Sequence, residues 1–336
     1  MATEVRTENQ GGKMMRVLAI LLVFISNMTL AMNPEPANAA FSSWLVFSQG
    51  SGKKQLMWLS EEDGSMLDGP FQGPMAFITD KNGNLWVGDS LNARILAFDS
   101  NGKQGREYDL IAAAKAAGLA SDPLLIDLTP GINGKLIAAD ASNNAIIEID
   151  LRGGKPRAFT SPPAGSDHHW SQINRIHSDS AGEIYIEDVA LRHTVILNRD
   201  GKPQKTLAGH IGLAVAESSR IALISASDGE MTEWYVLTSE QPGGELVKLA
   251  RLNAENPILW CSLIGYDGQQ RLHVIYDTAR ARHYITLDSE GIITNKHTTL
   301  LHDPGYDVNR PDWIDKSGRI YTLQVKHPAL SILRLD

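Results

Sequence analysis

The sequence predicts an all-β fold, a β-propeller with six blades, on three observations. Two kinds of Gly-containing turn recur along the chain, short β-prone apolar runs separate them, and only residues 110–119 show a helical pattern. Gly83 and Gly318 occupy equivalent positions five repeats and 235 residues apart, so the mean repeat is 47 residues. Four strands in about 40–50 residues are typical of a propeller blade. A parallel α/β fold is disfavoured because it needs helical crossovers between its strands.

The first kind of turn leads into an apolar run that has a polar end. Residues 80–83, for example, precede the run at 85–89, which ends in Asp89. The same arrangement recurs at residues 131–134, 179–182, 267–268 and 315–318 and, in weaker form, at 217–220.

The second kind of turn closes each repeat. An Asp or Asn followed by Gly supplies the left-handed residue that a tight hairpin requires. Each repeat is therefore predicted to fold as strand, Gly turn, strand, polar loop, strand, Gly turn, strand. The second turn is found at residues 61–64, 99–102, 150–153, 198–201, 241–244 and 288–291.

The two ends of the repeating region decide the number of blades. Residues 44–48 and 330–335 both fit the strand pattern. If they join in one blade, they close a six-bladed ring with a surplus strand or two, whereas separate blades would give seven. We favour six, and in either case the ends meet, which hides the open edges of the ring.

The N-terminal region, residues 1–40, is predicted to be a signal peptide. Lys13 and Arg16 precede an apolar run at residues 17–30, and residues 37–39 (Ala-Asn-Ala) form a cleavage pattern, so we expect a cut near Ala39. An uncleaved anchor is the alternative, but the run is short for a span of about 20 residues. The mature chain, residues 41–336, is then a single propeller domain that is secreted or periplasmic, with no stable membrane insertion.

Composition excludes several classes of protein. The net charge of −8 argues against a nucleic-acid partner. Cys261 is the only cysteine, so there is no internal disulfide framework and no cysteine cluster for zinc. It follows Trp260 in an apolar run, where we expect a buried thiol. Separately, we expect the chain to be a monomer.

One repeat resembles a known family. Residues 83–95 (GNLWVGDSLNARI) and 98–103 (FDSNGK) are similar to an NHL repeat, residues 139–146 match it in part, and the other repeats match it loosely. This resemblance implies a six-bladed propeller over about residues 41–336. NHL-like folds include binding scaffolds, lactonases and lyases, so the resemblance does not choose a chemistry.

The strand order predicts which face of the ring holds a functional site. Both kinds of Gly turn lie on one face, which we call the turn face. The loops between second and third strands and those between blades lie on the opposite face, which we call the loop face. Loops on a rigid scaffold carry most functional residues, so we expect the site on the loop face, near the central channel.

Several residues of these loops are candidates for binding a ligand. The segment 162–172 does not follow the repeat, so it is harder to explain as scaffold. Aromatic and Arg side chains supply much of the energy of binding surfaces. The predicted ligand-binding residues are His168, His169, Trp170, Arg192, His193, Arg280, Arg282, His302, Tyr306 and Arg310.

Other polar residues recur in register and have a structural interpretation. Asp89, Asp140 and Asp188 occupy one position in three repeats, so we expect each to brace its own hairpin. The arginines that follow in these loops, Arg94, Arg192 and Arg282, are expected to pair with such acids or with adjacent blades.

A metal-dependent enzyme is the alternative function. A calcium site needs a ring of oxygen ligands. Glu187, Asp188, Asp303, Asp307 and Asn309 could supply one, as in lactonases of propeller form. Zinc is disfavoured, because consecutive side chains such as those of residues 168 and 169 point apart in extended chain.

A lyase is a variant of this alternative. It would use a histidine as general base and a divalent ion to stabilise an enolate, and it resembles the virginiamycin B lyase type. His193 and His302 are the candidate bases.

The function that the sequence favours is an exported scaffold without a cofactor. It would bind a protein, peptide or glycan on the loop face. The alternative is a calcium-dependent lactonase, ester hydrolase or lyase of propeller fold.

Overall fold

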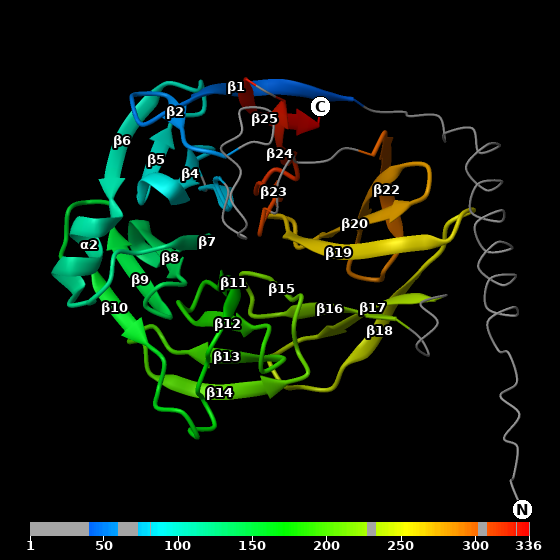
Figure 1. Cartoon of the computed structure of the whole chain (residues 1–336). Helices are drawn as coiled ribbons and strands as arrows, with labels where there is room; N and C mark the ends of the chain where they lie inside the picture. Colours follow the sequence, from blue (N-terminus) through cyan, green and yellow to red (C-terminus); the bar gives the residue numbers. More distant parts are fainter. Residues whose placement is uncertain are drawn as a thin grey trace, which may run out of the picture.

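The chain forms a ring of six antiparallel sheets, in a computed structural model that describes residues 40–59, 73–80, 82–226, 233–301, 308–326 and 328–335. Figure 1 shows the sheets arranged around a common axis, each with one edge toward the centre. The sheet order confirms the predicted six-bladed β-propeller.

Each of the first three blades is a four-stranded sheet whose innermost strand comes first in the chain. Blade 1 contains β3 (Ala76–Thr79), β4 (Leu85–Asp89), β5 (Arg94–Phe98) and β6 (Gln104–Asp109). Blade 2 contains β7 (Leu125–Pro130), β8 (Lys135–Asp140), β9 (Ala145–Asp150) and β10 (Arg157–Thr160). Blade 3 contains β11 (Ile173–Ser178), β12 (Ile184–Asp188), β13 (His193–Leu197) and β14 (Pro203–Ala208).

Blades 4 and 5 follow the same order. Blade 4 contains β15 (Ala214–Val215), β16 (Ile221–Ala226), β17 (Trp234–Ser239) and β18 (Val247–Leu252). Blade 5 contains β19 (Ile258–Tyr266), β20 (Leu272–Thr278), β21 (Arg282–Leu287) and β22 (Ile293–Thr299).

Blade 6 closes the ring with strands from both ends of the chain. Its inner strands are β23 (Asp312–Ile314), β24 (Ile320–Lys326) and β25 (Ala329–Leu335), and β1 (Phe41–Gln49) pairs with β25 in antiparallel register from Phe41↔Leu335 to Ser48↔Ala329. β2 (Gln55–Leu56) adds a fifth strand, parallel to β1. The predicted joining of the two ends is confirmed, and β2 is the surplus strand.

Among the residues that the structure describes, helical structure is confined to short segments. The α-helix α2 (Leu110–Ala117) matches the one predicted helical stretch and lies at the outer rim of the ring in Figure 1. Asp109 caps its first turn by accepting a hydrogen bond from the Ala112 amide, and Gly118 ends it in the left-handed conformation. The two 3-10 helices are η1 (Ser90–Asn92) and η2 (Ile132–Gly134). No helix among the described residues is long and apolar enough to span a membrane.

Apolar side chains fill the spaces between neighbouring blades. Most middle strands are buried on both faces, as the near-continuous apolar runs predicted. One cluster joins blade 1 to blade 6 and includes Phe47, Trp58, Phe77 and Phe98, each at most 1% exposed. Because Phe47 comes from β1, the first strand of the chain is part of this core.

The turns of the turn face do not all use glycine where the sequence suggested it. In blade 5, Gln270 at φ 62° takes the left-handed position that Gly83 takes in blade 1. Gly268 has a different role, because a Cβ at that position would lie 2.7 Å from the carbonyl oxygen of Lys316 in blade 6. The glycine of this turn therefore permits a close contact between two blades.

We expect ring closure to depend on the packing of β1. Phe47→Ala removes a buried ring that lies edge-on to Phe98, with 5.3 Å between the centroids. The free energy of unfolding should fall by about 3–5 kcal/mol in urea titrations. Val46→Ala is the control, because Val46 is 58% exposed on the same strand and its loss should change stability by less than about 0.5 kcal/mol. Equal stability of the two variants would contradict this account.

Candidate functional site

Three aspartates of the loop face bind backbone amides of neighbouring loop segments. Asp89 accepts a hydrogen bond from the Met57 amide at 3.1 Å, and Asp140 accepts one from the Leu124 amide at 3.0 Å. Asp188 accepts from the amides of Ser171, Gln172 and Leu191. Each carboxylate thus braces loops, which agrees with the structural role that their repetition predicted.

The arginines of these loops differ in their environment. Arg94 donates to Asp89 at 2.8 Å and also to the carbonyl oxygen of Gln55, so it fixes β2 to blade 1. Arg282 forms a two-bonded ion pair with Asp277, with both distances at 2.8 Å. Arg192 is exposed and forms no ion pair among the described residues, so its predicted pairing is wrong.

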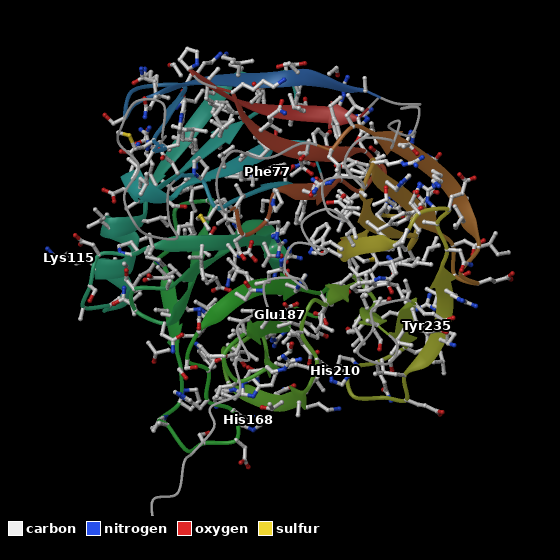
Figure 2. The ribbon with its side chains drawn as sticks, turned by 45° about the vertical axis from the view of Figure 1, so that its right-hand side comes forward. Phe77, Lys115, His168, Glu187, His210 and Tyr235 are labelled. Atoms are coloured by element: carbon white, nitrogen blue, oxygen red, sulfur yellow. The ribbon has the colours of Figure 1, made fainter. Side chains whose placement is uncertain are left out.

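The segment that contains His168, His169 and Trp170 lies away from the channel. His169 Nδ1 contacts the Pro162 carbonyl oxygen at 2.8 Å, and His168 Nδ1 contacts the Thr206 hydroxyl at 2.9 Å. Trp170 is 1% exposed and donates to the Asn144 carbonyl oxygen. The expectation that Trp170 offers a flat surface to a ligand is corrected by this burial, and Figure 2 shows His168 near the edge of the molecule, apart from Glu187.

The remaining predicted residues are not brought to one place. His193 contacts the carbonyl oxygen of His169 at 3.0 Å, so it belongs to the same outer loop region. Arg280 lies in the turn before β21, with its Nε buried and without a hydrogen-bond partner in the described structure. Arg310 is the one predicted ligand-binding residue, among those that the structure describes, that lines the central cavities. His302, Tyr306, Asp303 and Asp307 are outside the described residues.

A large cavity opens on the turn face, opposite the face on which the sequence predicts the site. It has a volume of about 990 Å³, and the first Gly turns of blades 2, 3 and 5 form its rim. His177 and Arg310 lie at its inner end. The short turns leave a wide opening above the inner strands, which explains why a cavity forms on the turn face.

Two smaller cavities continue along the axis toward the loop face. One, of about 120 Å³, shares His177 and Arg310 with the large cavity. The next, of about 320 Å³, shares Arg175 and Trp260 with the small one and ends on the loop face. These shared residues place the three cavities end to end, with the charged residues at the narrow middle.

A buried ion pair crosses the ring at this narrow point. Arg310, from the segment before β23, donates to Asp127 Oδ2 of β7 at 2.7 Å and to the Ile176 carbonyl oxygen of β11 at 2.8 Å. Its own amide donates to the Met75 carbonyl oxygen. Burial raises the pKa of the Asp127 carboxyl, and the positive charge of Arg310 opposes that increase. Through its side chain and its backbone amide, this residue connects the segment before blade 6 to blades 2 and 3 and to the segment before blade 1.

A histidine and a glutamate form a second buried pair beside it. His177 Nε2 lies 3.2 Å from Glu187 Oε1, and Glu187 also accepts from the Gly212 and Leu213 amides. Burial lowers the pKa of His177, and the hydrogen bond to Glu187 opposes the decrease. Burial alone would raise the pKa of Glu187, but its hydrogen bond with His177 and the charge of Arg175 hold it below its usual value.

These shifts fix the protonation of the pair. A carboxylate only accepts hydrogen bonds, so the proton of neutral His177 is on Nε2. Nδ1 then carries a free electron pair, and it has no hydrogen-bond partner in the part of the chain that the structure describes. An imidazole held in one tautomer by a carboxylate is suited to accept a proton.

Arg175 and Asn309 complete the narrow region. Arg175 Nη2 donates to the Asn309 carbonyl oxygen at 3.3 Å, which is its only hydrogen bond among the described residues. The Asn309 amide donates to the carbonyl oxygens of Ile126 and Asn174. Most donors of Arg175 thus remain available to a ligand in the adjoining cavities.

The residues predicted as calcium ligands do not form a metal site in the described structure. Glu187 and Asp188 are adjacent on β12 and bind different partners, Glu187 toward blade 4 and Asp188 toward the loop before β11. Asn309 uses its amide on backbone carbonyls. No group of three His, Cys, Asp or Glu side chains that could hold a metal ion is present among the described residues.

Sequence reasoning missed His177, Arg175 and Asp127. All three lie on innermost strands, where the sequence showed only part of an apolar run. A usable signal was the charge of the segment 173–178 (INRIHS), which is unusually polar for an inner strand. The signal becomes specific only when Glu187 from the next strand is placed beside it.

Comparison with known proteins supports the fold. No family model and no curated protein matches the chain. A catalytically inactive virginiamycin B lyase from Staphylococcus aureus, solved with quinupristin, is similar over 81% of this chain and 84% of its own, with 14% identity and a TM-score of 0.50. A gluconolactonase candidate is similar over 90% and 94%, with 12% identity and a TM-score of 0.50.

At these identities the likeness shows the fold alone. These neighbours support a propeller family for the chain, while the NHL assignment stays a prediction.

We expect Asp188→Ala to destabilise the fold through lost amide contacts. Removal of the carboxylate should reduce the free energy of unfolding at pH 7 by about 1–3 kcal/mol, measured in urea, with the exposed Asp200→Ala as control. Although burial raises the pKa of Asp188, backbone amides outweigh it and hold the pKa below its usual value. The difference between wild type and variant should therefore be full above about pH 4 and shrink as the pH falls further.

The negative charge of Glu187 should affect the measured pKa of His177. We expect wild-type His177 to titrate below its usual 6.5 because burial lowers its pKa, and stability should fall as the pH drops below that value. Glu187→Gln removes the charge that opposes this shift, so the pKa should fall further. NMR titration of the His177 ring measures both proteins, and an increase in the pKa would refute the assigned pair.

Proposed function

We propose that the chain is an enzyme that opens small cyclic esters by general acid–base catalysis in the central channel. The observation that carries this proposal is the His177–Glu187 pair, with its free Nδ1, at the junction of the cavities. Arg175 lies on the same cavities and has donors available for an oxygen that becomes negative.

The proposed hydrolysis balances with these residues. His177 Nδ1 accepts a proton from water while the water oxygen bonds to the ester carbonyl carbon. Arg175 donates to the resulting oxyanion. The ring C–O bond then breaks, the ring oxygen receives the proton from His177, and a hydroxy acid is the product.

A lyase reaction would use the same base on a different proton. His177 would accept a proton from the carbon next to the C–O bond. The C–H electrons form a C=C bond, the carboxylate leaves, and its product is an unsaturated acid. Reaction in ¹⁸O-water distinguishes the two, since only hydrolysis adds solvent oxygen to the product.

The similar solved structures support an enzyme in general terms. One is named a lyase and the other a gluconolactonase candidate, so the fold is used for both reaction types. Their low identity leaves the choice of substrate to the residues of this chain.

An exported binding scaffold is the second candidate function. It is favoured by exposed apolar side chains at loop-face ends of strands, among them Leu191, Leu259 and Leu300, each at least 46% exposed. Exposed apolar side chains suit contact with a protein, peptide or glycan partner. Export rests on the predicted signal peptide at residues 1–40, and fractionation of the native host tests it.

The variant His177→Gln tests the enzymatic proposal. Loss of the base should reduce kcat for hydrolysis of γ-butyrolactone or γ-decalactone by about 10²–10⁴-fold, measured by pH-stat titration. His168→Gln is the matched control, because that residue lies in the outer loop and its loss should leave kcat unchanged. No turnover by the wild type on a panel of cyclic esters would favour the scaffold.

A further inference from the structure

The cavity at the loop-face end of the channel has two chemically distinct parts. Its outer wall is apolar and aromatic, formed by Trp234, Trp260, Ile211 and Ile224. Its inner end is polar, formed by Arg175 and the buried Glu187. A volume of about 320 Å³ is within the range that binds small molecules.

The apolar outer wall of this cavity is also exposed to solvent. Trp260 is 42% exposed and Val189 is also 42% exposed, although both are large apolar residues at the mouth. The Arg282 guanidinium, which is paired with Asp277, lies 5.8 Å from the centre of the Trp260 ring, within the range of a cation–π contact. Covering an exposed aromatic surface with an apolar group lowers the free energy of the complex.

The charges at the inner end cancel. The charged residues that line this cavity are Arg175 and Glu187, one positive and one negative. Burial alone would raise the pKa of Glu187, but the hydrogen bond with His177 and the charge of Arg175 hold it below its usual value, so Glu187 is ionised at pH 7. An added carboxylate would give this low-dielectric region a net negative charge, which is costly. A neutral carbonyl oxygen, in contrast, accepts a hydrogen bond from Arg175 without changing the balance.

We propose that this cavity binds a neutral carbonyl compound with an apolar substituent, its carbonyl oxygen on Arg175 and its alkyl or aryl group against Trp260 and Trp234. The inference deepens the proposed function and rests on it for the identity of the carbonyl as a cyclic ester. The substrate class is then a lactone with an apolar side chain. The carboxylate formed by ring opening upsets the charge balance, which favours its release.

Binding of an unreactive ketone tests the cavity separately from catalysis. The probe is 2-heptylcyclopentanone, titrated into the full-length chain by calorimetry and by tryptophan fluorescence, with decanoate as its anionic counterpart. The ketone should bind at least about tenfold more tightly than decanoate, since only the carboxylate adds a charge. Trp260→Ala should weaken ketone binding by about tenfold, since it removes the aromatic surface.

Two further variants make the test specific. Ile293→Ala removes an apolar side chain that is 49% exposed on β22 and does not line the cavity, so it should leave the ketone affinity unchanged. Arg175→Gln replaces the guanidinium with a side-chain amide, which is a single donor group. This variant should weaken ketone binding about tenfold and remain folded. Circular dichroism of each variant checks the fold.

The outcomes separate this proposal from the catalytic one. Absence of saturable ketone binding, equal affinity for decanoate, or equal effects of Trp260→Ala and Ile293→Ala would overturn the assigned cavity. Ketone binding of the expected pattern without turnover of any lactone would support the cavity and overturn the enzymatic function. With turnover, Trp260→Ala should raise KM for γ-decalactone and not for γ-butyrolactone.

Discussion

The buried contact between Arg310 and Asp127 is the constraint on which the rest of the ring depends. The two residues are 183 positions apart in sequence, and the pair brings blade 2 to the segment that enters blade 6. The same guanidinium binds a carbonyl oxygen of blade 3, and the Arg310 amide binds one that precedes blade 1. Loss of either partner would leave an uncompensated buried charge, which is far more costly than a lost surface contact.

This contact also creates the conditions for chemistry in the channel. Because it occupies the axis, it divides the channel into a wide cavity on the turn face and a smaller one on the loop face. His177 and Arg175 lie beside it on β11, both partly buried, where water screens their charges less than at the open surface. A base with a lowered pKa and an arginine with available donors follow from this placement.

The periphery of the ring uses similar residues for a different purpose. Asp89, Asp140 and Asp188 bind backbone amides of the loops, and the histidines of the segment 161–170 bind backbone or hydroxyl oxygens. These side chains provide hydrogen-bond partners for backbone groups of the loops that meet where one blade follows another. Polar residue type alone therefore does not distinguish a brace from a site in this protein.

The sequence by itself determined the β-propeller and the meeting of its two ends, because turn chemistry and apolar runs are local and repeat along the chain. It favoured six blades over seven, and the sheet order of the structure settled the number. It also indicated the bracing role of Asp188, because that position recurs. The tertiary structure alone decided the site. Pairing of β11 with β12 brings His177 to Glu187 within blade 3, and closure of the ring brings Arg310 to the same axis. Burial and mutual charge then set the protonation of His177 and Glu187.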